Sequence, residues 1–167
     1  MRREYGNVVV IDPVPARLLW REHAEGFVQV EDYHEVGAQL LVMAYLQRVV
    51  NGGGQILREY AAGSERIDIL IKWPVADENG KVDLYGDHFE NHLWELKVWS
   101  DAGKKADPKD KALVQMGEYV ARVACASATL MVFDRRAAAL AVDWEDRVRV
   151  EVARPEVQGV GVVVVRA

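Results

Sequence analysis

The sequence predicts one α/β domain, and three observations support this prediction. The chain has 167 residues and half of them are hydrophobic, so one sizeable core can form. Between about residues 32 and 135, two segments carry apolar residues near helical spacing and four shorter segments are strand-like. These segments follow in the order helix, strand, strand, strand, helix, strand, which is typical of an α/β fold. No repeat, low-complexity tract or linker divides residues 1–167, so we expect a single domain.

Charge and cysteine content narrow the classes of function. The net charge of −5 is unusual for a free nucleic-acid-binding protein, so a local basic patch or a partner would have to compensate. The single cysteine, Cys125, excludes a disulfide framework and favours a reducing environment. No apolar run is long enough to span a membrane, and the first residues lack a signal-peptide core. We therefore expect a soluble cytoplasmic protein without a membrane partner.

The first third of the chain contains one predicted strand and one predicted helix. Val8 to Ile11 reads as a strand that ends before two prolines. A helix is expected between Asp32 and Asn51, and the glycines at 52–54 end it. Its apolar residues near helical spacing are Val36, Leu40, Met43, Ala44, Val49 and Val50. The glycines precede no Lys-Ser or Lys-Thr pair, which argues against a P-loop and places any ATPase on another chain.

A hairpin and a long polar excursion follow. Residues 55–61 and 67–73 read as two strands joined by the turn at 62–65. The segment 74–92 is expected to hold little regular structure apart from a tight turn at Asn79-Gly80. His88 and His92 lack a third ligand at zinc-site spacing, so we interpret them as surface histidines.

The next strand, residues 93–99, carries an acid and a base where an ordinary core strand carries neither. Because side chains alternate along a strand, Glu95 and Lys97 share one face. The opposite face is formed by Trp94, Leu96 and Val98. Upstream, Asp68 interrupts a second apolar run, and a charge inside a sheet needs a partner or a metal. Adjacent placement of these strands would bring two carboxylates and one ammonium into a single pocket.

The second helix is expected to start at Asp107-Pro108 and to run to about Ala126. One polar stripe is formed by Lys111, Gln115, Tyr119 and Arg122, at steps of four, four and three. The opposite, core-facing side is formed by Leu113, Met116, Val120 and Ala124. A buried strand at 128–133 and a C-terminal hairpin of 148–152 with 160–165 complete the prediction.

In this order, Asp68, the tripeptide Glu95-Leu96-Lys97 and the pair Gln115 and Tyr119 resemble the D…ExK…QxxxY series of PD-(D/E)XK nucleases. The branch concerned includes RecB-like exonucleases and Holliday-junction resolvases. An acid-x-base triplet alone occurs by chance in most proteins, but its apolar flanks and the order of the motifs are more specific. The chain also looks similar to nuclease-like domains that follow an ATPase module in bacterial proteins.

The resemblance covers about residues 32–135 and implies both a fold and an activity. The implied fold is a restriction-endonuclease-like αβββαβ core with a central mixed sheet flanked by helices, here extended by the C-terminal β-hairpin. The implied activity is hydrolysis of phosphodiester bonds of nucleic acid, with DNA as the expected substrate and Mg²⁺ or Mn²⁺ as the cofactor. Asp68, Glu95 and the Leu96 carbonyl would bind the metal, and Lys97 would orient the attacking water.

Other residues are assigned supporting roles. Gln115 and Tyr119 would position the water or the scissile strand. Glu35 either supplies a further metal-site carboxylate or forms a capping box with Asp32, and the sequence leaves both open. The expected phosphate contacts are Lys104, Lys105, Lys111 and Arg122.

Two further readings of the sequence stay open beside the nuclease. The domain could be a nuclease-fold module that binds nucleic acid or an ATPase partner without cutting. It could instead be a structural appendage whose carboxylates pair with Lys97 and Arg66. A homodimer is compatible with either reading.

Overall fold

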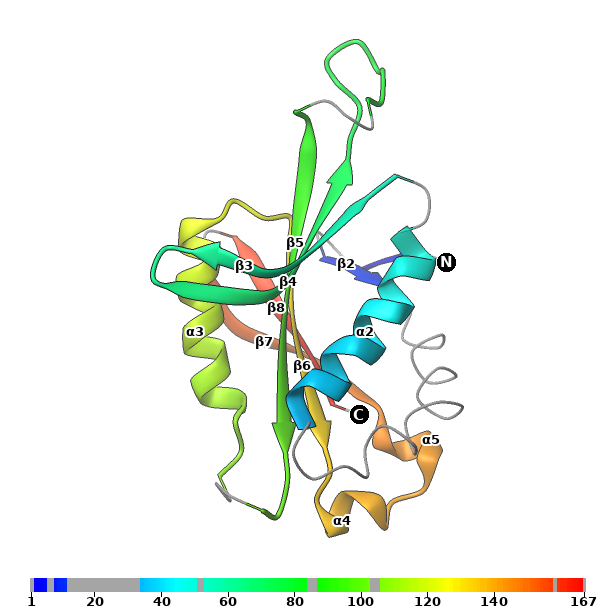
Figure 1. The fold of residues 1–167 in the computed structure, drawn as a ribbon, viewed down its shortest axis with the longest axis vertical. Coiled ribbons are helices and arrows are strands. Elements are labelled where there is room, and N and C mark those ends of the chain that lie inside the picture. Colours follow the sequence, from blue (N-terminus) through cyan, green and yellow to red (C-terminus); the bar gives the residue numbers. More distant parts are fainter. Residues whose placement is uncertain are drawn as a thin grey trace.

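The computed structural model describes residues 2–5, 8–11, 34–50, 53–83, 87–102, 106–157 and 159–166 (Figure 1). Its centre is a six-stranded mixed sheet with the order β3-β4-β5-β6-β8-β7. The strands are β3 (Gln55–Ala62), β4 (Glu65–Pro74), β5 (Phe89–Trp99), β6 (Ser127–Asp134), β7 (Arg149–Val157) and β8 (Val160–Arg166). The α/β class and the mixed sheet flanked by helices are thus confirmed.

Strand direction changes in the middle of the sheet. β3, β4 and β5 are antiparallel neighbours, whereas β5, β6 and β8 are parallel to one another. β7 pairs antiparallel with β8, so the predicted C-terminal hairpin forms and extends the sheet. Because the three parallel strands run the same way, their carboxyl ends meet at one edge of the sheet.

One long helix covers each face of the sheet. The helices are α2 (His34–Val50) and α3 (Lys109–Arg122), and two short helices, α4 (Ala137–Leu140) and α5 (Trp144–Arg147), link β6 to β7. The α2 side buries Leu46, Ile69, Ile71, Leu96 and Phe133, and the α3 side buries Met116, Leu93, Leu130, Val132 and Val164. Each fully buried aliphatic side chain contributes about 1.5 to 3 kcal/mol. The central strands therefore have a core on both faces.

The two long helices differ from the prediction in which residues face the core. On α2 the buried stripe follows i, i+4 spacing through Ala38, Val42, Leu46 and Val50, whereas Leu40 and Val49 are exposed. Of the apolar residues chosen from the sequence, Val50 is buried and Met43 packs against the core, whereas Leu40, Ala44 and Val49 are exposed. On α3 the Asp107 carboxylate accepts the Lys109 N–H at 2.9 Å, which confirms the predicted cap. That helix ends at Arg122, and Ala124 is exposed rather than in the core.

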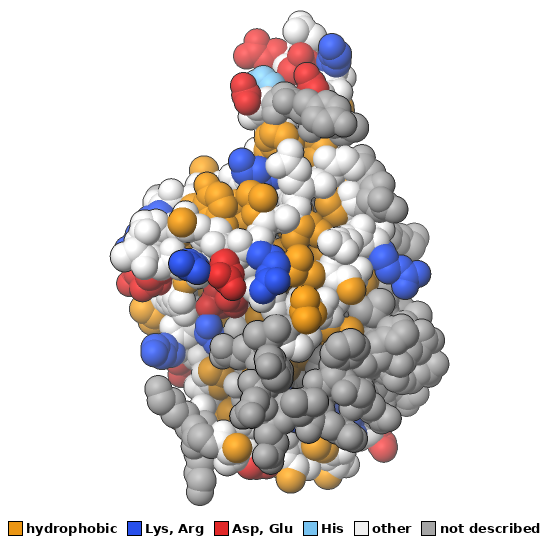
Figure 2. All heavy atoms as spheres, viewed as in Figure 1, with side chains coloured by type: hydrophobic (Ala, Val, Ile, Leu, Met, Phe, Trp, Pro, Cys, Tyr) orange, Lys and Arg blue, Asp and Glu red, His pale blue; other side chains and the backbone are white. Residues whose placement is uncertain are grey.

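The β4–β5 connection projects from the body as a long hairpin (Figure 1). Both strands extend to the pair Pro74 and Phe89, so the expectation of little regular structure in 74–92 is wrong at both ends. At the tip, the Asp77 carboxylate accepts the N–H groups of Asn79 and Lys81, each at 2.9 Å. The predicted turn at Asn79-Gly80 is present. Figure 2 shows mostly acidic side chains at this tip.

The amino-terminal residues that the structure describes form a small separate sheet. β1 (Arg2–Tyr5) and β2 (Val8–Ile11) pair antiparallel, and β2 coincides with the predicted strand. Among the helices of the described residues, none is long and apolar enough to cross a bilayer.

Candidate functional site

The candidate site lies where the pairing between β4 and β5 stops. Ile69 and Trp94 form the last Cα pair of this ladder, so Asp68 and Glu95 would be the next. Beyond that point the Leu96 N–H donates to Asp68 Oδ2, at 2.8 Å, instead of to a backbone carbonyl of β4. An ionisable side chain thus replaces a ladder acceptor in the middle of the sheet. The predicted neighbourhood of Asp68 and Glu95 is present in the structure.

Glu95 is a buried carboxylate on the α3 side of β5, with only 1% of its surface exposed. Its Oε1 pairs with Lys97 Nζ at 2.5 Å, as the strand alternation predicted for two residues on one face. Its Oε2 is also buried and has no hydrogen-bond partner among the described residues. A buried carboxylate oxygen without a partner costs folding free energy. Such an atom therefore marks Glu95 as a residue whose environment favours a ligand.

Burial and charge both act on the proton affinity of Glu95. Removal from water raises the pKa of Glu95, the nearby Asp68 carboxylate raises it further, and Lys97 only partly opposes them. The result is a pKa of about 7 instead of 4.5. At neutral pH the carboxyl group is therefore protonated in a large fraction of molecules unless a cation binds it.

Helix α2 holds Asp68 from the other side of the sheet. The Gln39 side chain donates from Nε2 to the Asp68 carbonyl at 3.3 Å, and its Oε1 accepts from Arg58 at 2.8 Å. Gln39 is buried, so this polar relay is shielded from water. Neither Gln39 nor Arg58 was predicted as a site residue, and the one sequence signal for them is a glutamine beside the apolar stripe of the helix. Glu35 belongs to the first turn of α2, but its side chain lies outside the described residues, as do Asp32 and the capping box.

Helix α3 approaches the site through Tyr119. The Tyr119 hydroxyl donates to the Arg66 carbonyl at 2.7 Å and accepts a hydrogen bond from Gln115 Nε2. Burial raises the pKa of Tyr119 to about 12, and the Glu95 charge adds to this effect. Tyr119 is fully buried, so its expected place on a polar stripe opposite the core is wrong. Its ring packs against the sheet, and only its hydroxyl needs a polar partner.

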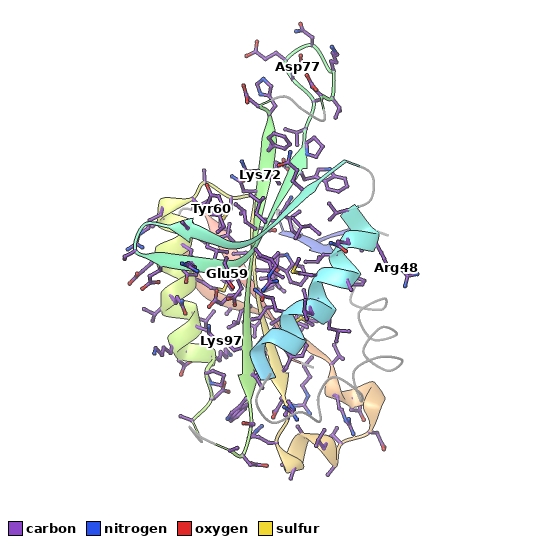
Figure 3. The ribbon with its side chains drawn as sticks, viewed as in Figure 1. Arg48, Glu59, Tyr60, Lys72, Asp77 and Lys97 are labelled. Atoms are coloured by element: carbon purple, nitrogen blue, oxygen red, sulfur yellow. The ribbon has the colours of Figure 1, made fainter. Side chains whose placement is uncertain are left out.

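A charged group on β3 lies beside the site. Glu59 occupies the β3 position opposite Asp68 and has a φ of 46°, which strains a residue with a Cβ. Its carboxylate pairs with Arg66 at 2.9 Å and with Arg58 at 3.8 Å. In the view of Figure 3, Glu59 and Lys97 both lie between α2 and α3, and Figure 2 shows acidic and basic side chains close together on this face. Arg66 is thus engaged by Glu59, which differs from the pairing expected in the structural-appendage reading.

Of the residues expected to contact phosphates, the structure describes Lys111 and Arg122, which lie apart on α3. Lys111 is exposed, whereas Arg122 donates to the Ala62 carbonyl at 3.1 Å and pairs with Glu118 at 3.5 Å. Arg122 follows Lys111 by eleven positions, which is a rise of about 16 Å along a helix. Lys104 and Lys105 lie outside the described residues.

We next consider which described side chains could bind a metal ion. No group of three or more His, Cys, Asp or Glu side chains is arranged to hold an ion there. The two histidines considered for zinc are separated: the His92 ring bonds to Ser127 Oγ at 2.8 Å, and His88 is exposed. His92 is half-buried, so the surface interpretation holds only for His88. What the described residues do offer a cation is the pair Asp68 and Glu95.

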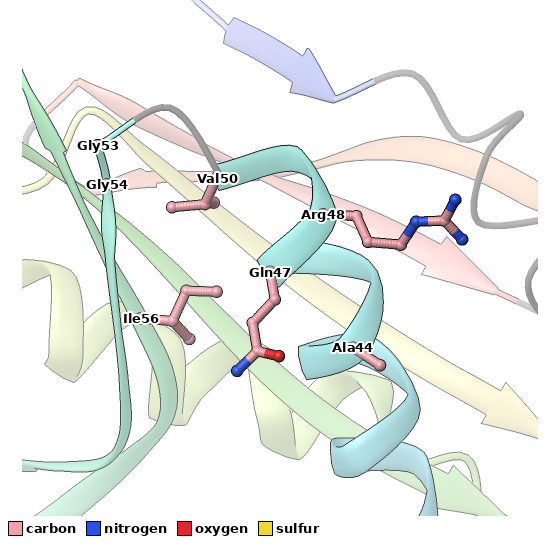
Figure 4. Close-up of a pocket in the computed structure, with 7 residues that line it drawn as sticks. All are labelled: Ala44, Gln47, Arg48, Val50, Gly53, Gly54 and Ile56. Atoms are coloured by element: carbon pink, nitrogen blue, oxygen red, sulfur yellow. The ribbon is translucent and has the colours of Figure 1, made fainter.

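A hollow beside α2 has chemistry different from that of the Glu95 site (Figure 4). It measures about 670 Å³ and lies between the carboxyl-terminal half of α2 and the start of β3. Its described lining residues are Ala44, Gln47, Arg48, Val50, Gly53, Gly54 and Ile56. Arg48 is the one charged side chain among them, and Figure 4 shows it pointing away from β3. Without a carboxylate or a nucleophile, this hollow does not offer the acid-base chemistry of the Glu95 site.

Comparison with known proteins does not assign the chain to a family. No protein-family model matches the chain, and no curated protein or solved structure matches it significantly. The resemblance to PD-(D/E)XK nucleases therefore rests on the residues themselves and on their placement around Asp68 and Glu95.

The buried position of Tyr119 gives a stability prediction. Tyr119→Phe removes the donor to the Arg66 carbonyl and should lower the free energy of unfolding by about 1 to 3 kcal/mol. Urea unfolding would measure this loss. The control is Tyr60→Phe, since the Tyr60 hydroxyl bonds to none of the described residues, and its loss should be within about 0.5 kcal/mol. Equal stability of the Tyr119 variant and wild type would contradict the buried hydrogen bond.

Proposed function

We propose that the chain is a divalent-metal-dependent nuclease that hydrolyses phosphodiester bonds, with DNA as the expected substrate. The observation that carries the proposal is the unpartnered Oε2 of Glu95, buried beside Asp68 where the ladder between β4 and β5 stops. A positively charged side chain, Lys97, reaches the same carboxylate. The two carboxylates can supply oxygen ligands to a cation. The ammonium group of Lys97 can bind a phosphoryl oxygen.

The donors present fit Mg²⁺ or Mn²⁺ better than Zn²⁺. Mg²⁺ usually keeps several waters and is held by one or two carboxylates together with substrate phosphate oxygens. Asp68 and Glu95 supply that number of carboxylates, and the buried Glu95 Oε2 has an unused lone pair. The Leu96 carbonyl is a further oxygen candidate, because the N–H and C=O groups of a strand residue point to the same neighbour and its N–H already faces Asp68.

Each polar residue of the site then has a defined task. A bound cation would polarise the phosphoryl group and would lower the pKa of a water molecule that it coordinates. Lys97 would leave Glu95 for the substrate, where its ammonium orients the attacking water and offsets charge that develops in the transition state. Gln39 and Tyr119 act indirectly, since they bond to backbone carbonyls of β4 at Asp68 and Arg66. Gln115 reaches the site through the Tyr119 hydroxyl.

A structural role for Glu95 and Lys97 is the second candidate, because their ion pair is formed in the structure. In that case the domain would serve as a non-catalytic nuclease-fold module that binds nucleic acid or an ATPase partner. The raised pKa of Glu95 counts against a purely structural pair, since a stabilising partner normally lowers the pKa of a carboxyl group.

Cleavage assays with single-stranded and double-stranded DNA and RNA test the proposal. Wild type should cut at least one substrate with Mg²⁺ or Mn²⁺ and none in EDTA. Lys97→Ala should reduce cleavage by at least about a hundredfold while metal binding, measured by calorimetry, persists. Lys111→Ala is the control, because this exposed lysine lies outside the proposed site and its loss should change binding and salt dependence only. Wild-type cleavage rates in the Lys97 variant would remove the role proposed for Lys97.

A further inference from the structure

A second polar pocket lies at the edge of the sheet where the parallel strands end. Its volume is about 330 Å³, and four arginines and three aspartates contribute to its lining. Trp99, Asp134 and Arg166 come from the carboxyl ends of β5, β6 and β8. This is the edge where ligands of open α/β sheets commonly bind. The concentration of arginines is notable in a chain whose net charge is −5.

Two arginines of this pocket oppose each other directly. Arg149 of β7 and Arg166 of β8 form a Cα pair in an antiparallel ladder. Like charges in that arrangement destabilise a sheet. Arg166 forms an ion pair with Asp107, in which Nη2 lies 2.6 Å from Oδ2. Arg149 is exposed and has no ion pair among the described residues. The fold therefore keeps a repulsive pair that an anion would relieve.

Contacts with Trp99, Asp134 and a backbone carbonyl hold three of the guanidinium groups in place. Arg136 stacks on Trp99 with its Cζ 3.2 Å from the ring centroid, and Arg166 lies 5.5 Å from the same ring. Asp134 binds Arg136 through Nε and one Nη, which leaves the donors of the other Nη for a ligand. Arg147 is bonded to the Val142 carbonyl at 2.7 Å and so fixes the wall made by α4 and α5. Guanidinium groups fixed in this way have already lost the freedom that binding would otherwise remove.

We infer that this pocket binds a phosphomonoester, such as the terminal phosphate of a nucleic acid strand or of a mononucleotide. A phosphomonoester carries close to two negative charges and three terminal oxygens at neutral pH, which suits donors that converge from several arginines. A carboxylate, with two oxygens and one charge, would be satisfied by a single arginine fork. The inference is independent of the nuclease proposal, because it rests on residues other than Asp68, Glu95 and Lys97.

Both proposals can nevertheless concern one ligand. Trp99 lies four residues beyond Glu95 on β5 and on the same face of the strand, so the two sites are about 13 Å apart along the sheet. An oligonucleotide whose terminal phosphate occupied the arginine pocket could extend past Lys97 toward Glu95.

The test is calorimetric titration of the full chain in EDTA at low salt. The ligands are inorganic phosphate, acetate, and a short oligonucleotide with either a 5′-phosphate or a 5′-hydroxyl group. Phosphate and the 5′-phosphorylated oligonucleotide should bind, and Arg149→Gln should weaken both by roughly tenfold. Arg48→Gln, the same change at an arginine outside the pocket, should leave their binding unchanged. Glu95→Gln should leave the affinity for inorganic phosphate unchanged, because an ion bound in this pocket does not reach the proposed catalytic site about 13 Å away.

Thermal melting tests whether Arg149→Gln loses binding only because the variant is less stable. Arg149→Gln removes one of two opposed charges, so its melting temperature in chloride buffer should equal or exceed that of wild type. Equal affinity for acetate and phosphate would overturn the inference, as would phosphate binding that Arg149→Gln does not change. Equal binding of the 5′-hydroxyl oligonucleotide would overturn the assignment to a monoester and indicate a backbone phosphodiester instead.

Discussion

Glu95→Gln should stabilise the metal-free protein at pH 8 by as much as about 3 kcal/mol and should have little effect near pH 4. The pKa of Glu95 is raised from 4.5 to about 7 in the folded state, so the folded protein binds this proton more tightly than the unfolded chain does. Wild type therefore loses stability as the pH rises from about 4.5 to about 7, and the loss is complete above that window. Glutamine never ionises, so the variant avoids the loss.

Urea unfolding in EDTA at a series of pH values measures this difference. Glu118→Gln is the matched control, because Glu118 is half-exposed on α3 and the same change there should alter stability by no more than about 0.5 kcal/mol at any pH. If the pair of Glu95 and Lys97 serves structure alone, Glu95→Gln should instead destabilise the protein at pH 8, by about 3 to 5 kcal/mol for a buried pair. The sign of the effect thus separates the two roles.

Mg²⁺ or Mn²⁺ should raise the melting temperature of wild type by about 5 to 10 °C once the ion is present at a hundred times its dissociation constant. Mass action at that ratio adds about 2.7 kcal/mol of stability, and about 2 to 4 °C per kcal/mol is usual for a domain of this size. Binding of the cation would also remove the repulsion between Asp68 and Glu95. The shift should disappear in Glu95→Gln and shrink strongly in Asp68→Asn.

Variants with an intact carboxylate pair provide the comparison for this shift. Lys97→Ala should keep the whole metal-dependent rise, since its ammonium repels the ion and contributes no ligand. Glu118→Gln should keep it as well. No metal-dependent rise in wild type, or the same rise in Glu95→Gln, would argue against a metal site at these carboxylates and therefore against the proposed nuclease.

The arrangement of the sheet could be predicted from local pattern to a large extent. Strand alternation correctly placed Glu95 and Lys97 on one face of β5, because side chains in a strand alternate whatever their partners are. The turn between β3 and β4 and the C-terminal hairpin were also predicted correctly, because the sequence signals for such turns lie within a few residues. The β4–β5 hairpin was missed because Pro74 and the polar residues near Phe89 are poor strand formers, and pairing across the sheet outweighs that preference.

The contacts that complete the candidate site could not be predicted in this way. Gln39 meets Asp68 across 29 positions of sequence, and Tyr119 meets Arg66 across 53. Helical spacing placed Tyr119 on a polar stripe but could not show that this one side chain is buried while Lys111 and Arg122 stay exposed. The strained backbone at Glu59 likewise has no signature in a strand-like segment. Residues that act through tertiary contacts become visible only when the sheet and both helices are assembled.

The hydrogen bond from Leu96 to Asp68 makes sheet cohesion and ligand binding compete for one oxygen. This bond continues the contact between β4 and β5 beyond Ile69 and Trp94, the last pair of their backbone ladder. A cation bound at Asp68 Oδ2 would draw electron density from this oxygen and weaken its bond to the Leu96 N–H, and by reciprocity the strength of that bond would affect the affinity for the cation.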